Sequence, residues 1–274
     1  GAVYNFTGPQ GFGIANMTDA LLAVKTLVYD KKVLKLCELK AALDNNFGLD
    51  MDAATAEKLT KTVASKLVAD GKSLTEEDIK SIYIAVSKNP ASDEDKRRYS
   101  AILEQIRELP KYGNDLADVD AFARDVAYTY TKPLEQYKNP RGGMFQAGLY
   151  PVSANVPLGA QTGATPDGRA AFTPIADGVG PAAGRDVKGP TASANSVAKL
   201  DHFIASNGTL FNMKFHPSAL EGMKGLSKFV SLIRSYFDQK GMHVQFNVVT
   251  KETLLDAQAH PEKYKTLVVR VAGY

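Results

Sequence analysis

Residues 242–274 read MHVQFNVVTKETLLDAQAHPEKYKTLVVRVAGY, and this stretch decides the fold class. Apolar and β-branched side chains gather at 242–249 and again at 266–271, a composition typical of buried strands. Between them, the segment 251–259 is rich in helix-forming residues and predicts a helix. The stretch therefore predicts two strands joined through a helix.

The same alternation extends upstream. A strand is expected over 209–215, with helices on either side of it over 193–206 and 217–239, and a short strand is expected over 148–152. Strands that alternate with helices are typical of an α/β fold, in which helices cover buried strands. The sequence therefore predicts an α/β architecture.

The first half of the chain is mainly helical by its apolar periodicity. Apolar side chains recur at helical spacing over 17–32, 33–47 and 116–137. The segment 50–109 differs because it is charged and alanine-rich, and Ser73 and Thr75 before two glutamates predict the start of a helix within it. We interpret this segment as a helical insert.

Composition narrows the class of partner. The chain has 274 residues, of which 44% are hydrophobic, enough to bury a large core. Its net charge of +3 comes from 33 basic and 30 acidic residues without a long basic cluster, so neither nucleic acid nor a membrane is expected as a partner. The single cysteine excludes an internal disulfide framework and favours a cytoplasmic compartment.

Gly273 is the residue whose chemistry stands out. A glycine α-carbon that loses one hydrogen leaves a planar radical, which both adjacent amides can delocalise because no Cβ interferes. The structural alternative is a strand that ends in a glycine turn. The short motif around Gly273 leaves both interpretations open.

Six segments together resemble the pyruvate formate-lyase-like glycyl radical enzymes, in the order in which that family has them. The segments are YNFTGPQG at 4–11, PKYGND at 110–115, GATPDGR at 163–169, KFHPSA at 214–219, HVQFN at 243–247 and RVAGY at 270–274. The resemblance covers most of the chain outside the charged insert, and six ordered segments are far more specific than one.

The resemblance implies a fold and a division of the chain. The family has a ten-stranded barrel, made of two five-stranded halves and surrounded by helices, of which this chain would supply the later part. We expect a barrel-associated loop and helices over 1–49, the charged helical insert over 50–109, helices and barrel strands of the lyase core over 110–260, and a truncated glycyl radical domain over 261–274.

The resemblance also implies how the radical is made and used. An activating enzyme with an iron–sulfur cluster and S-adenosylmethionine would install the radical on Gly273, with no other cofactor bound. Arg270 would support the radical loop, or would be a surface arginine at a strand end. The family further implies a homodimer in an anaerobic bacterium, free in the cytosol or packaged in a microcompartment.

The cysteine departs from the family pattern. Family members carry a thiyl-forming cysteine at the tip of a loop, and in the eliminating members a glutamate follows it in a Cys-x-Glu pattern. Cys37 is instead followed at once by Glu38 and lies at helical spacing among leucines. We expect Cys37 to be a buried structural residue. The catalytic cysteine and glutamate are then expected upstream of Gly1, and the chain looks like a portion of a longer polypeptide.

Two further segments have structural interpretations. His216 and His243 are expected to make structural hydrogen bonds rather than to bind metal, because the chain lacks a close histidine pair. The segment 163–169 is expected to form a Pro-Asp-Gly turn that braces the mouth of the barrel.

Side chains near residue 150 bear on the substrate. Tyr150 matches a position where glycerol and propanediol dehydratases have a tyrosine that lines the pocket, although a packed core tyrosine is the alternative. Gln146 stands where isethionate lyases have an arginine suited to an anion.

The charged insert over 50–109 resembles that of larger family members such as propanediol dehydratases. The resemblance therefore favours dehydration of propane-1,2-diol, ahead of glycerol, to an aldehyde.

Three alternatives remain open at this point. The chain could belong to another glycyl radical lyase, such as a choline trimethylamine-lyase or an isethionate sulfite-lyase. It could instead be a non-catalytic spare part that replaces a damaged radical loop, which the missing Cys-x-Glu loop favours. A third alternative is an α/β binding domain without a radical.

Overall fold

The computed structural model describes residues 5–264. The predicted strand over 266–271, with Arg270 and Gly273, lies outside the described residues. The elements, in chain order, are α1 (Ile14–Ala23), the π-helix η1 (Val24–Asp30), α2 (Leu36–Asp44), the 3-10 turn η2 (Asn46–Gly48), α3 (Ala53–Ala69), α4 (Glu76–Ser87), α5 (Asp93–Glu108), α6 (Ala117–Leu134), α7 (Asn155–Gly159), α8 (Pro190–Ala198), β1 (Asn212–Phe215), η3 (Pro217–Leu220), α9 (Gly222–Asp238), β2 (Gln245–Val248), α10 (Lys251–Ala259) and η4 (Pro261–Tyr264).

The chain divides into two compact units. The first unit contains residues 1–19, 110–157 and 175–274, and the second contains 20–109 and 158–174. Within residues 5–264, none of the helices has both the length and the hydropathy that a bilayer crossing requires. The predicted boundaries at 49, 109 and 260 stay predictions.

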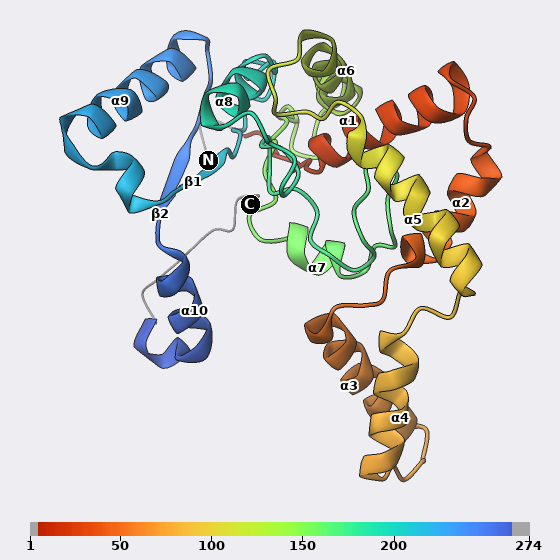
Figure 1. The fold of residues 1–274 in the computed structure, drawn as a ribbon. Coiled ribbons are helices and arrows are strands. Elements are labelled where there is room, and N and C mark those ends of the chain that lie inside the picture. The colour runs from red at the N-terminus through yellow and green to blue at the C-terminus, as the bar shows by residue number, and fades with distance from the viewer. Residues whose placement is uncertain (1–4, 265–274) are drawn as a thin grey trace. The chain divides into compact units, whose positions relative to one another are not determined.

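The first unit contains a parallel β-α-β arrangement. Strands β1 and β2 pair in parallel from Asn212 opposite Gln245 to Phe215 opposite Val248, and helix α9 connects them. Figure 1 shows the two strands side by side, with α9 beside them. The ring of Phe229 on α9 packs against Phe215 at 5.6 Å and against Phe246 at 4.6 Å between centroids, so aromatic contacts hold the helix on the strands.

The parallel pairing continues beyond these two strands as single bridges. The bridged pairs, all parallel, are Thr7 with Phe145, Gln10 with Gly148, and Leu149 with Thr209. The four segments around residues 7–10, 145–149, 209–215 and 245–248 therefore form one row. The α/β prediction agrees with this row, while the ten-stranded barrel stays a prediction.

The predicted strands are longer than the observed ones. The strand expected over 148–152 is only a pair of bridged residues, Gly148 and Leu149, and the strand expected over 209–215 begins at Asn212. The reason at 148–152 is local, because Val152 has a φ of 57°, which a regular strand does not permit. The helix over 251–259 matches its prediction at both ends.

The second unit is helical and has its own core. Buried side chains of α2, α5 and the turn between α2 and α3 meet around Phe47, Leu39 and Ile106. The predicted helical insert consists of α3, α4 and α5, and Figure 1 shows α3 and α4 as a hairpin. Thr75 caps α4, because its hydroxyl accepts from the Asp78 backbone N–H at 3.2 Å, as its position before the helix predicted.

The prediction that Cys37 is buried is wrong. It was expected to be buried at helical spacing among leucines, but its side chain is exposed. The reason is its position on α2: the apolar period continues through Leu36 and Leu39, yet only Leu39 is buried, and Leu36 is 53% exposed. The first turn of α2 therefore lies at the surface, and Cys37 with it.

Candidate functional site

Tyr150 lies directly after Gly148 and Leu149, the bridged residues of the second segment in the row. Its side chain is half-buried, and its hydroxyl oxygen accepts a hydrogen bond of 2.9 Å from the Asn207 Nδ2 amide. Gly148 and Tyr150 are two residues apart, a spacing that places both on the same face of an extended segment. The Tyr150 ring lies over the Gly148 backbone on that face.

Glycines make the space for this tyrosine and asparagine pair. A Cβ added at Gly148 would lie 2.7 Å from the Tyr150 ring and 2.8 Å from Asn207 Nδ2, and one added at Gly8 would lie 2.2 Å from Asn207 Nδ2. Carbon atoms of real side chains do not approach so closely. The pair therefore occupies a slot, which we call the glycine slot, whose walls are Gly8 and Gly148.

The backbone holds the segment 207–210 against the segment 147–149. The Asn207 N–H donates to the Ala147 carbonyl at 3.0 Å, and the Leu149 N–H donates to the Gly208 carbonyl at 2.8 Å. Gly208 has a φ of 106°, which favours glycine. The Asn207-Gly208 turn is thus fixed by hydrogen bonds on both sides, so the Asn207 amide is held where Tyr150 meets it.

Tyr130 on α6 is a second phenol near this slot. Its hydroxyl oxygen is buried, and within residues 5–264 it has no hydrogen-bond partner. Burial raises the pKa of Tyr130 above its ordinary value, and the nearby Tyr150 adds to this effect. The ring packs against Gly11 and borders a cavity of about 200 Å³, lined mainly by apolar groups that include Leu149.

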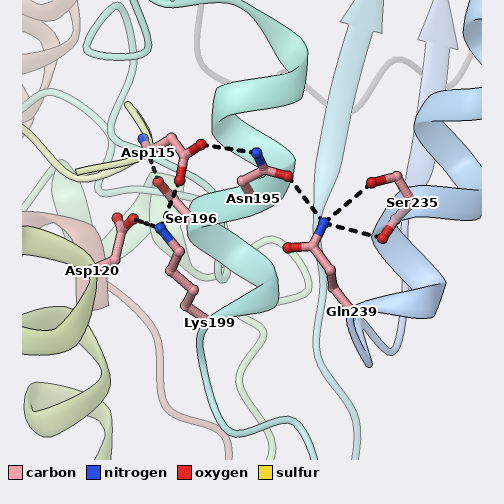
Figure 2. Close-up of polar contacts among 7 residues, drawn as sticks. All are labelled: Asp115, Asp120, Asn195, Ser196, Lys199, Ser235 and Gln239. Atoms are coloured by element: carbon pink, nitrogen blue, oxygen red, sulfur yellow. Dashed lines mark hydrogen bonds and ion pairs between the residues drawn. The ribbon is translucent and has the colours of Figure 1, made fainter. Parts of the chain in front are cut away.

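An ion-pair network fixes helix α8 in the same unit. Lys199, the C-cap residue that directly follows α8, pairs with Asp115 at 2.6 Å and with the fully buried Asp120 at 2.9 Å (Figure 2). Hydrogen bonds from Lys199 and then from Asn195 hold the pKa of Asp115 below its ordinary value. Gln239 at the end of α9 donates to Asn195 at 3.0 Å, so α8 is joined to both α6 and α9.

The predicted site residues divide into two groups. Tyr150 lies among the described residues, where its contact with a substrate stays a prediction, whereas Gly273 and Arg270 lie outside the described residues. Asn207, Gly8 and Tyr130 were not predicted as site residues. The sequence signal that could have found Asn207 is its position before glycine, since an Asn-Gly pair marks a turn.

Both histidines make hydrogen bonds to nearby groups of the chain. His216 Nδ1 lies 2.7 Å from the Ser218 hydroxyl at the start of η3, and His243 Nδ1 accepts from the Phe211 N–H at 3.3 Å. Within the described part of the chain, no group of three or more His, Cys, Asp or Glu side chains is arranged to hold a metal ion.

The sequence matches two families over most of its length. Residues 1–159 match the family described as pyruvate formate lyase-like, and residues 175–274 match the family described as glycine radical. Among curated relatives, the probable dehydratase YbiW of Escherichia coli K12 is 39% identical over 281 residues, which is 100% of this chain and 29% of the relative. Decarboxylases and an isethionate sulfite-lyase are also among the relatives.

Two solved structures are similar over the whole chain. One, solved for 1,2-propanediol dehydration in Roseburia inulinivorans, has 59% identity and a TM-score of 0.81, covering 100% of this chain and 29% of that one. The other, the glycerol-bound B12-independent glycerol dehydratase of Clostridium butyricum, has 48% identity and a TM-score of 0.77, with the same coverage. The chain thus spans about 29% of the length of these similar proteins.

Proposed function

Since this chain belongs to the pyruvate formate lyase-like glycyl radical family, we propose that it is part of a dehydratase that converts a short 1,2-diol into an aldehyde. Propane-1,2-diol is the proposed substrate, ahead of glycerol. Identities of 59% and 48% to structures concerned with propanediol and glycerol dehydration support this order.

The hydrogen bonding of Tyr150 supports an uncharged diol as the class of substrate. The Tyr150 side chain is half-buried, and within residues 5–264 its hydroxyl is bonded to a neutral amide, Asn207, rather than to a charged group. A neutral phenol with a free proton suits an uncharged hydroxyl ligand, because a phenol both donates and accepts hydrogen bonds. A carboxylate or sulfonate substrate would instead favour an arginine, which binds anions in a bidentate manner.

The proposed chemistry divides between this chain and the rest of the polypeptide. Gly273 stores the radical, steadied by Arg270, after an S-adenosylmethionine activating enzyme removes a hydrogen. The radical passes to a cysteine outside this chain, and that thiyl takes a hydrogen atom from C1 of the diol. The C2 hydroxyl leaves as water with a proton from a glutamate, also outside this chain, and the C1 hydroxyl gives up its proton to a base there, so that no net proton is consumed. The aldehyde radical on C2 then takes the hydrogen atom back from the cysteine thiol, which re-forms the thiyl radical. Tyr150 binds a diol hydroxyl throughout.

The experiment uses the complete polypeptide that carries this chain, activated without oxygen. We expect an electron paramagnetic resonance doublet from the glycyl radical, and aldehyde formed from propane-1,2-diol. Gly273→Ala abolishes both the doublet and the turnover, because a Cβ removes the planar, delocalised radical. Gly163→Ala is the control: its Cβ would meet no atom within 4 Å, so the doublet should persist.

Other outcomes separate the alternatives. Cleavage of isethionate or choline, with both diols untouched, would overturn the diol assignment and leave the family membership intact. A doublet without turnover of any diol, together with restored activity of an oxygen-damaged lyase, would indicate a spare part. A missing doublet in the activated wild type would contradict the radical assignment.

A further inference from the structure

We propose that Asn207 is a positioning residue that sets the Tyr150 hydroxyl as a hydrogen-bond donor to the substrate. This inference rests on the proposed function, because it assigns a role to the group that Tyr150 presents. It concerns a contact within the described chain: the Asn207 Nδ2 amide donates to the Tyr150 oxygen at 2.9 Å.

The direction of this hydrogen bond decides what the phenol can do. A phenol has one proton to donate and oxygen lone pairs that accept. The Asn207 amide donates, so it occupies a lone pair, and no acceptor within residues 5–264 takes the proton of Tyr150. The hydroxyl can therefore donate that proton to a diol oxygen, while the amide keeps the ring from turning away.

The surroundings show that the pair is built into the fold. The glycine slot admits the Asn207 side chain only because Gly8 and Gly148 lack a Cβ, with separations of 2.2 Å and 2.8 Å from Asn207 Nδ2 to the Cβ each would otherwise carry. A longer side chain at 207 would meet the same walls. The slot thus selects a short side chain that can reach Tyr150.

The segment that carries Asn207 is anchored at both ends. It begins after Lys199, whose ammonium pairs with the buried Asp120 at 2.9 Å (Figure 2). It ends where the Asn207 N–H donates to Ala147 and the Leu149 N–H donates to Gly208. A segment held at both ends keeps its side chains in place without ordering cost at binding, which is how positioning residues act.

The test compares Asn207→Asp, Asn207→Ala and Tyr150→Phe in the activated complete polypeptide with propane-1,2-diol. The carboxylate that Asn207→Asp introduces accepts a hydrogen bond from the Tyr150 hydroxyl. The Tyr150 proton is then no longer available to the substrate. We expect Asn207→Asp and Tyr150→Phe each to raise KM by about tenfold, and Asn207→Ala by about threefold, the range of a lost hydrogen bond. The radical doublet and kcat should change much less.

Two readouts separate positioning from a general structural role. When pH falls and the carboxyl introduced by Asn207→Asp takes up a proton, it can donate again, so the KM of that variant should fall toward the wild-type value. In the Tyr150→Phe background, Asn207→Ala should add almost nothing, because the partner is gone. Tyr29→Phe is the control, since Tyr29 is 62% exposed and lies outside the segments that form the slot, and the KM of this variant should stay unchanged.

The outcomes distinguish this inference from the proposed function. If Tyr150→Phe leaves KM unchanged, the assignment of Tyr150 to substrate is wrong. If Tyr150→Phe raises KM while both Asn207 variants behave as wild type, the positioning role is wrong and the function stands. An Asn207→Asp variant whose KM is raised equally at every pH would also contradict the donor assignment.

Discussion

At the scale of single residues, glycines decide the geometry of the site. Gly148 is buried between Tyr150 and the Asn207 amide, and it leaves no room for a methyl group. Sequence reasoning identified Tyr150 but read the glycine beside it only as part of a short strand. The steric demand of a glycine becomes visible only when the atoms opposite it are known.

We predict that Gly148→Ala destabilises the protein by about 1–3 kcal/mol, the typical cost of overpacking a filled site. The added Cβ would lie 2.7 Å from the Tyr150 ring, so the ring or the Asn207 amide must move. Denaturant unfolding of the variant measures this loss. Gly163→Ala, whose Cβ has open space, should unfold like the wild type, and equal behaviour of the two variants would contradict the steric account.

At the scale of elements, one arginine organises the loop over 162–173. The guanidinium of Arg169 is buried and donates to the carbonyls of Thr173 at 2.7 Å and Ala170 at 3.1 Å, and to the Thr165 hydroxyl at 3.1 Å. It also donates to the Gly163 carbonyl. The predicted Pro-Asp-Gly turn is confirmed by the Gly168 N–H bond to the Thr165 carbonyl at 3.0 Å.

We predict that Arg169→Lys destabilises the fold by about 1–3 kcal/mol. A lysine ammonium cannot reach all the carbonyls that the planar guanidinium of Arg169 binds, so buried carbonyls lose their hydrogen-bond partner. Hydrogen exchange should rise mainly over 162–173. The exposed Arg97→Lys serves as the matched control and should leave exchange unchanged. Equal protection of the loop in both variants would show that Arg169 does not organise it.

At the scale of the whole molecule, a buried histidine couples stability to pH. His202 is 4% exposed, and burial lowers its pKa below the ordinary value of 6.5, against the opposing effects of the Val197 carbonyl and Asp201. Its Nε2 lies 2.9 Å from the Val197 carbonyl and its Nδ1 lies 3.2 Å from the Thr209 hydroxyl. The native state therefore keeps this ring neutral.

We predict that the free energy of unfolding decreases as pH falls below about 6.5, because His202 then binds a proton in the unfolded chain but not in the native state. The loss continues down to the lower folded-state pKa and is absent above pH 6.5, where both states are neutral. Denaturant unfolding at a series of pH values gives the slope. His202→Gln should remove this part of the slope, and an unchanged slope would assign it to other groups.

The sequence alone predicted most of the helical segments, the α/β alternation and the family, because periodicity, capping and motif order depend on neighbouring residues. The helix over 251–259 and the cap at Thr75 are of this kind. Only the tertiary structure shows that Gly8 and Gly148 leave room for Asn207 beside Tyr150, that the strand expected over 148–152 is reduced to two bridged residues, and that Cys37 is exposed. These features depend on contacts between distant segments, and such contacts are set by loop closure and packing rather than by local propensity.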